Sequence, residues 1–404
     1  MSTEVLEIPR IISVDDHVVE PPDLWTARMS AKYRDRAPRV ERSKATVTWT
    51  GGFFAYERSD DGADSDWWIF EDYEFAVPAV MHGAGVKDVD NVPTTYEAMD
   101  PSAWDQSARI AAITADHVDA ALCFPNTMPR FAGQAFAQRA DKELALACIR
   151  TYNDWLIDEW CGGAGRGVLL PVAIVPFWDP ELSAQEIRRV AKKGCFAITF
   201  PENPHPVGFP SLYDAQWDPL FQAAADAGVV VCLHIGSSSK MQTTAPEAPF
   251  IISSTLTFSN GMGALLDFIF SGILDRIPRL RIALSEGQVG WMPYLLERAD
   301  KLWSERGSNS FGSTLPAPPS SYVPGRVWGC IFDDEVGLRL RDLVGMDQIC
   351  YETDFPHADS PYPNTLETVR KIVTKAGLND GEIYKLLRGN AIEAFGLHRF
   401  GINE

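Results

Sequence analysis

Short apolar runs alternate with longer amphipathic stretches along most of this chain of 404 residues. The runs place Val, Ile, Leu and Ala on consecutive positions, which is typical of parallel strands buried on both faces. The stretches between them carry apolar residues at helical spacing, as in ELSAQEIRRVAKK at 181–193. Eight strands are predicted in this way, over residues 11–17, 118–124, 168–175, 195–200, 229–235, 280–285, 327–332 and 348–354.

Eight alternating strand and helix units predict a (β/α)8 TIM barrel, in which chemistry is carried at the C-terminal ends of the strands. An open doubly wound sheet is the alternative, but the dinucleotide-binding form of that fold would have GxGxxG after its first strand, and this chain does not. We therefore predict one barrel domain over residues 1–404. Its further helices are predicted over 140–160, 216–227, 261–274 and 334–344.

Residues 28–104 are more than a minimal barrel needs after its first strand. The segment is rich in aromatic and turn-forming residues, and loops this long are usually lids or small subdomains. We therefore predict an insertion or lid at this position. Its Trp67 and Trp68 are candidate substrate-binding residues that would cover the pocket, although aromatic pairs more often serve packing alone.

The composition is that of an ordinary globular chain, with 46% hydrophobic and 23% charged residues. Its 36 Lys and Arg against 55 Asp and Glu leave a net charge of −19, without a basic cluster that would bind a phosphate backbone. The seven cysteines form no CxxC pair, which disfavours a zinc finger or a disulfide framework. The N-terminus has no apolar signal core, and no run has membrane-spanning length. We predict a cytoplasmic protein with no nucleic-acid or membrane partner.

Three of the predicted strands end in side chains that commonly bind metals. IISVDDH delivers Asp15 and His17, GVVVCLH delivers His234, and QICYETD delivers Asp354. Asp15 and His17 share one face of their strand because side chains alternate with a period of two, whereas Asp16 points to the other face. Any one of these residues alone would more often be structural, for instance as a helix cap. Their coincidence at strand ends that share one mouth of a barrel predicts a metal site.

The mixed nitrogen and oxygen ligands suit one divalent metal ion, with zinc ahead of manganese or iron, and the lack of cysteine in the set disfavours a structural zinc site. No lysine lies within the strand at 195–200, so a carboxylated lysine that bridges two ions is not expected. A fourth run, LRIALSE, delivers Glu286, which would be a further ligand, a general acid or base, or a buried partner for a cation. We favour proton transfer, because desolvation raises the pKa of a carboxyl toward neutral pH, although a neighbouring metal cation lowers it.

The order of these motifs resembles the amidohydrolase-related metal enzymes, in particular the branch that contains 2-amino-3-carboxymuconate-6-semialdehyde decarboxylase and γ-resorcylate decarboxylase. ENPHPVGFPSLYDAQWDPLF, CLHIGSSS, SEGQVGWMPYLLERAD and DFPHADSPYP are similar to segments of actinobacterial members of that branch. The resemblance runs from about residue 11 to residue 398 and is most specific in the last segment. It implies a (β/α)8 barrel, a homodimer, and one divalent metal on Asp15, His17, His234 and Asp354.

Two positions depart from the pattern of that branch. The decarboxylase named first has HxH where this chain has Asp15 and His17, whereas γ-resorcylate decarboxylase has an acidic residue there, so this change is compatible with the metal. The branch usually has a proton-handling histidine at the position of Glu286. The second departure bears on the reaction rather than on the metal.

Two further histidines are candidates for the site. His357, three residues beyond Asp354, would orient substrate or shuttle a proton, or it would hydrogen-bond a loop carbonyl. His205 lies between prolines after the fourth strand, where contact with substrate and a fixed loop conformation both account for it. Glu20 either supports a metal ligand or, as we favour, caps the next segment.

The leading functional hypothesis is a metal-dependent, non-oxidative decarboxylase whose partner is a small aromatic or unsaturated carboxylic acid. The metal would hold the carboxylate, and Glu286 or His357 would protonate the carbon from which carbon dioxide leaves. The alternative is a metal-dependent hydrolase of an amide, ester, lactone or C–C bond, in which Glu286 removes a proton from water. A second alternative is a barrel that binds a ligand without catalysis.

Overall fold

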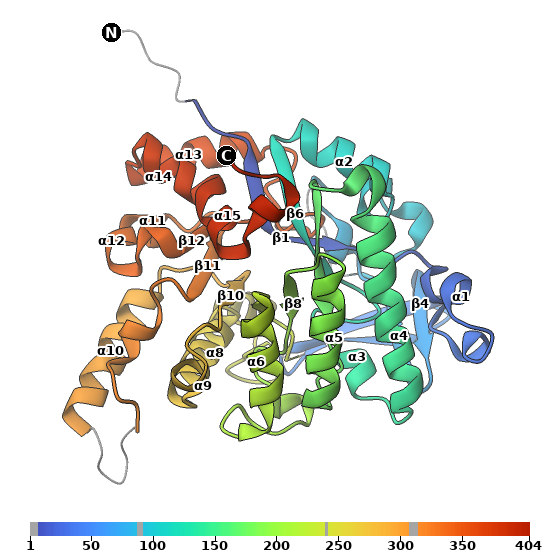
Figure 1. The fold of residues 1–404 in the computed structure, drawn as a ribbon. Helices are drawn as coiled ribbons and strands as arrows, with labels where there is room; N and C mark the ends of the chain where they lie inside the picture. The colour runs from blue at the N-terminus through green and yellow to red at the C-terminus, as the bar shows by residue number, and fades with distance from the viewer. Residues whose placement is uncertain (1–6, 87–91, 239–240, 307–313) are drawn as a thin grey trace.

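Eight parallel strands form the centre of the molecule, and helices surround them (Figure 1). The computed structural model describes residues 7–86, 92–238, 241–306 and 314–404. The strands pair in chain order, as β1 (Ile11–Val18), β6 (Val118–Pro125), β7 (Leu169–Ile174), β8 (Ala197–Thr199), β9 (Val230–His234), β10 (Ile282–Ser285), β11 (Val327–Ile331) and β12 (Ile349–Tyr351). The architecture is the (β/α)8 TIM barrel that the alternating pattern predicts.

The barrel closes at a seam where the segment after β12 meets β1. The backbone N–H of Asp354 donates to the carbonyl of Asp15 at 2.8 Å, and the N–H of His17 donates to the carbonyl of Phe355 at 2.7 Å. The last strand is therefore shorter than the predicted 348–354, because the chain leaves its pairing with β11 and turns toward β1. Asp354 lies beyond the strand with a left-handed backbone (φ 49°) rather than at its end. The seam brings two candidate ligands from opposite ends of the chain side by side.

Helices lie on the outside of the barrel at the predicted places (Figure 1). The helices predicted at 261–274 and 334–344 are each divided in two, the first of them at Gly272, whose backbone is left-handed (φ 77°). None of the described helices is both long and apolar enough to span a membrane. The helices are α1 (Leu24–Arg28), α2 (Gln106–Ala115), α3 (Gln134–Ala137), α4 (Lys142–Trp155, continued by a π-helical turn over Leu156–Trp160), α5 (Pro180–Lys192), α6 (Asp218–Ala227), α7 (Phe250–Leu256), α8 (Ser259–Phe270), α9 (Ile273–Arg276), α10 (Met292–Arg306), α11 (Glu335–Arg339), α12 (Arg341–Val344), α13 (Thr365–Ala376), α14 (Asp380–Tyr384) and α15 (Asn390–Phe395).

Helix α5 shows how local sequence sets these boundaries. The side chain of Asp179 accepts hydrogen bonds from the backbone N–H groups of Glu181 and Leu182, and Pro180 occupies the first turn, where its missing N–H costs nothing. The apolar side of α5 packs on the barrel through Ile187 and Val190, which are fully buried. The opposite side is charged, so the helix covers the barrel with its polar face in water.

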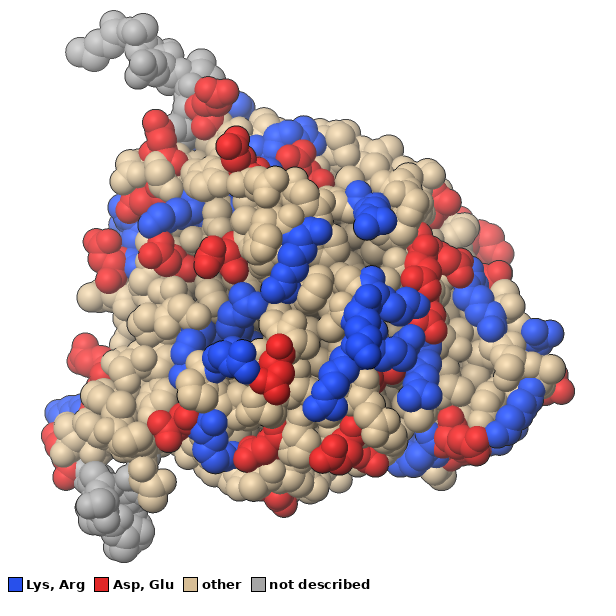
Figure 2. Space-filling model, viewed as in Figure 1, with Lys and Arg blue, Asp and Glu red and all other residues tan. Residues whose placement is uncertain are grey.

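Basic side chains gather over α5 and α6 on the face shown in Figure 2, with acidic side chains around them. Arg189 pairs with Asp154 at 2.6 Å, and Lys193 pairs with Asp158 at 2.6 Å. Exposed pairs of this kind contribute roughly 0–1 kcal/mol each. Two of the basic side chains are thus matched by carboxylates of the neighbouring helical segment.

Residues 28–104 contain a separate antiparallel sheet in the order β3-β2-β4-β5. Its strands are β2 (Arg39–Thr50), β3 (Phe53–Arg58), β4 (Ala63–Phe70) and β5 (Tyr73–Ala76). Trp67 and Trp68 are neighbours on β4 and therefore face opposite sides of this sheet. Trp67 packs with Ala45 and Ile69, whereas Trp68 packs edge-on against Trp25 of α1, with 5.3 Å between ring centres. Packing accounts for both tryptophans, and a lid role for 28–104 stays a prediction.

Replacing Trp68 with alanine should lower the free energy of unfolding by about 3–5 kcal/mol, because the change leaves a cavity between the small sheet and α1. Phe53→Ala is the matched control, since Phe53 is on the same sheet and 46% exposed. It should change stability by less than about 0.5 kcal/mol. Urea denaturation of both variants measures the difference. A small loss in both would show that the small sheet does not support the barrel.

Candidate metal centre and active site

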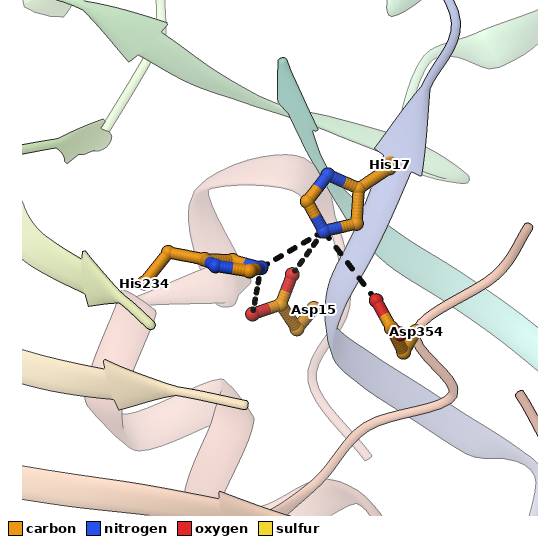
Figure 3. Close-up of side chains that lie close together, drawn as sticks. All are labelled: Asp15, His17, His234 and Asp354. Carbon is orange, nitrogen blue, oxygen red and sulfur yellow. Dashed lines mark hydrogen bonds and ion pairs between the residues drawn. The ribbon is translucent and has the colours of Figure 1, made fainter. Parts of the chain in front are cut away.

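The structure brings together the four side chains that the strand ends predict. Asp15 and His17 come from β1, His234 is the last residue of β9, and Asp354 follows β12 (Figure 3). One ligand atom from each lies within 4.8 Å of the ligand atoms of the other three, and all four residues are buried. Nε2 of His17 lies 3.5 Å from Asp15 Oδ1 and 3.4 Å from Asp354 Oδ1. Nε2 of His234 lies 3.7 Å from Asp15 Oδ2.

The two histidines face each other through the nitrogen atoms that a metal would bind. Nδ1 of His17 lies 3.0 Å from the carbonyl of Pro125, and Nδ1 of His234 lies 2.5 Å from the carbonyl of Ile235. A carbonyl only accepts hydrogen bonds, so each Nδ1 carries the proton and each Nε2 carries a lone pair. The two Nε2 atoms are 2.9 Å apart. Burial lowers the pKa of His234 to about 3 and that of His17 well below its ordinary value, so neither ring is protonated at neutral pH. Two lone pairs this close need a cation between them.

Three carboxylate oxygens of the group lack a hydrogen bond. Among the described residues, neither oxygen of Asp15 nor Oδ1 of Asp354 has a hydrogen bond, and all three atoms are buried. Burial raises the pKa of both groups, and the charges of Glu352 and Glu286 add to the effect. Buried carboxylates without partners are costly unless a cation compensates them. Two histidine nitrogens and two carboxylates fit a divalent ion, and zinc, manganese and iron(II) all accept such a set.

Asp16 points away from this group, as the period of the strand predicts. Its Oδ1 accepts hydrogen bonds from Ser13 Oγ at 2.8 Å and from Thr353 Oγ1 at 2.5 Å. Burial raises the pKa of Asp16 to about 6, although the charge of Arg109 opposes the shift. The Arg109 guanidinium is itself buried and donates to the carbonyl of His17 at 2.6 Å. These contacts fix the seam behind the metal group. Sequence reasoning missed Arg109, because an arginine within an amphipathic helix ordinarily indicates a surface position.

Glu286 follows β10 and lies beside the metal group. Its Oε2 is 3.4 Å from Nε2 of His234, and its side chain is 15% exposed. It is not among the four residues whose ligand atoms lie within 4.8 Å of one another. Burial raises its pKa well above the ordinary value, and the charges of Asp359, Glu352 and Glu202 raise it further. Glu286 therefore lies beside the site with a raised pKa, and a role for it in proton transfer stays a prediction.

His357 lies against the group, and its Nε2 is 3.4 Å from the side-chain oxygen of Asn126 in the loop after β6. Its Nδ1 is 3.0 Å from the carboxylate of Asp354, and its ring stacks on that of His17 with 4.0 Å between ring centres. Burial lowers its pKa to about 4, so the ring is neutral. The contact orients Asp354, which is the arrangement that commonly supports a metal ligand. A role of His357 toward substrate stays a prediction.

The sequence allowed two interpretations each for Glu20 and His205, and the structure gives the surroundings of both residues. The carboxylate of Glu20 accepts hydrogen bonds from the backbone N–H groups of Asn126 and Thr127, at 2.9 and 2.8 Å. The expectation that Glu20 caps the next segment is wrong, because it holds the loop after β6 instead. His205 is exposed in the turn at 205–207, and contact between it and substrate stays a prediction.

Two carboxyl groups at the site were missed from sequence. Glu202 follows β8, is 2% exposed, and has a pKa raised to about 7 by burial. Glu352 follows β12, is fully buried, and has a pKa raised to about 8 by burial. Oε2 of Glu352 accepts the backbone N–H of Glu286 at 3.1 Å. Glu202 and Glu352 each lie just beyond an apolar run, as the predicted metal ligands do. The same sequence pattern could therefore have predicted both residues as part of the site.

A (β/α)8 barrel with histidine and carboxylate donors gathered where the strands end defines a metal-dependent barrel enzyme. The chain belongs to the amidohydrolase family, whose model matches residues 47–397. It is 25% identical to a γ-resorcylate decarboxylase from Polaromonas sp. strain JS666 over 284 residues, 64% of this chain and 79% of the relative. The resemblance noted in the sequence is confirmed. The chain is an enzyme of the carboxy-lyase or hydrolase type, and the non-catalytic barrel is set aside.

Solved structures share the fold at lower identity. An amidohydrolase from Mycobacterium avium subsp. paratuberculosis K-10 superposes with a TM-score of 0.69 at 20% identity, covering 96% of this chain and 99% of that one. A dihydroxybenzoic acid decarboxylase from Polaromonas sp. JS666, with bound manganese and the inhibitor 2-nitroresorcinol, gives a TM-score of 0.60 at 16% identity, with 97% and 98% covered. Both confirm the architecture over almost the whole chain.

Replacing His234 with alanine should abolish stoichiometric metal binding, because it removes one of two facing nitrogen donors. His205→Ala is the matched control, since this exposed histidine lies outside the four-residue group. Elemental mass spectrometry on protein purified without added metal measures metal per chain. Equal metal content in the two variants would contradict the site.

Proposed function

We propose that this enzyme is a metal-dependent, non-oxidative decarboxylase of a small aromatic or unsaturated carboxylic acid. The observation that carries the proposal is the position of Glu286, whose Oε2 lies 3.4 Å from Nε2 of His234 and whose pKa is raised by burial. Decarboxylation needs a proton donor at the carbon that loses carbon dioxide, and a hydrolase needs a base at water. The similarity to a γ-resorcylate decarboxylase supports the same reaction class.

Asp15, His17, His234 and Asp354 would hold a single divalent ion. When bound, the ion supplies a Lewis acid and a positive charge that hold the substrate carboxylate and a neighbouring oxygen. Zinc, manganese and iron remain the candidates, and manganese occupies the decarboxylase of similar fold. His357 keeps Asp354 in position, and the backbone carbonyls of Pro125 and Ile235 keep the two histidines in the required tautomer.

The protonation step belongs to this chain's own residues. The bond between the ring carbon and the carboxylate breaks, carbon dioxide leaves, and the electron pair on carbon takes the proton of Glu286. Glu286 regains a proton from solvent, which its partly exposed side chain permits. Phe131 packs over the histidines, with its ring centre 5.0 Å from that of His17 and 4.4 Å from that of His234, and it gives this part of the site an apolar wall.

Hydrolysis of an amide, ester, lactone or C–C bond is the second candidate function. The observation in its favour is the carboxyl of Glu286 at a position where the resembled branch usually has histidine, because an ionised glutamate serves as base toward water. The raised pKa of Glu286 favours the acid form and hence decarboxylation. The homodimer and the cytoplasmic location stay predictions.

Incubation of the metal-loaded enzyme with 2,6-dihydroxybenzoate and related aromatic acids should release carbon dioxide. In deuterated water the product should carry one deuterium on the carbon that lost the carboxylate, and Asp354→Asn should show neither signal. Incorporation of labelled solvent oxygen into an organic product, without carbon dioxide release, would instead establish the hydrolase. Gas-phase mass spectrometry and product NMR measure both outcomes.

The same assay tests the proton donor. Glu286→Gln should lower kcat by about 100-fold to 10,000-fold while metal content is retained. His357→Gln is the comparison, because glutamine still offers a donor to Asp354, and it should keep most of the turnover. The reverse order of effects would make His357 the acid.

A further inference from the structure

The loop after β6 places the positively charged side chain of Arg130 near the candidate metal centre. Arg130 lies five residues beyond Pro125, the last residue of β6, and its backbone is left-handed (φ 59°), a conformation that residues other than glycine seldom adopt. Glu20 holds the start of this loop through the N–H groups of Asn126 and Thr127. The position of Arg130 is therefore fixed by buried contacts.

Two aromatic rings hold the guanidinium of Arg130. Its central carbon lies 4.6 Å from the ring centre of Phe75 on β5 and 5.5 Å from the ring centre of Phe131. Phe131 in turn packs against His17 and His234. One phenyl ring thus separates the guanidinium from the two histidines, and β5 of residues 28–104 forms its other wall.

No described carboxylate pairs with the charge of Arg130. Within the described residues the guanidinium makes no ion pair and no hydrogen bond, whereas nearby Arg139 pairs with Asp72 at 2.5 Å and covers Tyr73 of the same strand β5. A guanidinium that two rings already orient presents a planar set of donors that matches a carboxylate.

We propose that Arg130 binds a second anionic group of the substrate, so that the enzyme acts on an aromatic acid with two anionic substituents. One carboxylate would lie at the metal and the other group at the guanidinium. This inference rests on the proposed function in one respect, that the metal centre takes a carboxylate. Asp359 lies close enough to Glu286 for its charge to act there, and a carboxylate at this mouth would repel a dianion that met no cation besides the metal.

Calorimetric titration of the manganese-loaded enzyme with benzoate and with benzene-1,3-dicarboxylate tests the proposal. The wild type should bind the dicarboxylate more tightly than benzoate. Arg130→Met should weaken dicarboxylate binding about tenfold or more and change benzoate binding by less than about twofold. Arg130→Lys keeps the charge without the planar donors, so its affinity for the dicarboxylate should lie between those of the wild type and Arg130→Met. Arg139→Met is the matched control and should change neither affinity, because Asp72 already neutralises Arg139.

A wild type with no preference for the dicarboxylate, or an Arg130→Met variant that keeps the preference, would overturn the proposal. Equal weakening of both ligands would also overturn it, because that result indicates a role in supporting the site. Carbon dioxide release is measured separately. An enzyme that binds the dicarboxylate through Arg130 but releases no carbon dioxide would keep this inference and reject the proposed function. Release of carbon dioxide by an enzyme whose preference for the dicarboxylate is unchanged in Arg130→Met would keep the proposed function and reject this inference.

Discussion

The barrel seam is the constraint on which the rest of the structure depends. Two backbone hydrogen bonds, from Asp354 to Asp15 and from His17 to Phe355, close the sheet between the two ends of the chain. Backbone groups in a dry interior must find partners, so these bonds set one register for the closing segments. A slip of one residue on β1 would replace Asp15 and His17 at the site with Asp16 and its neighbours. The buried contacts among Ser13, Asp16, Thr353 and Arg109 secure that register from behind.

Register at the seam has an electrostatic consequence. It places carboxylates and neutral imidazoles within a few ångströms of one another where water does not reach, and burial then raises the carboxyl pKa values and lowers those of the histidines. Among the described residues, three carboxylate oxygens of this group have no hydrogen bond, and the Nε2 lone pairs of the two histidines face each other. Polar groups that break the ordinary rules of burial concentrate at functional sites. The divalent ion is thus required by the same packing that closes the barrel.

Some residues around the metal group orient the candidate metal ligands, whereas Glu286 has a different environment. Carbonyls of Pro125 and Ile235 set the tautomers of the two histidines, and His357 bonds Asp354, so none of these partners needs to change during a reaction. Glu286 differs, because its side chain is partly exposed and its pKa is raised by burial and by the charges of nearby carboxyls. The loop after β6 adds Phe131 over the histidines and Arg130 beyond it. Glu286, the four candidate metal ligands and Arg130 therefore come from different strand ends and the loops after them, which is how this fold supports many chemistries.

The sequence by itself determined the eight strands and most of the metal group, because both depend on short-range pattern. Continuous apolar runs mark strands buried on both faces, and a period of two puts Asp15 and His17 on one side. What only the tertiary structure decided are contacts between residues far apart in the chain: the bond of His357 to Asp354 beside His17, the placement of Arg109 behind β1, and the position of Arg130 against Phe75. The pKa values belong to this second class, since desolvation and neighbouring charges exist only once the barrel has closed around the site.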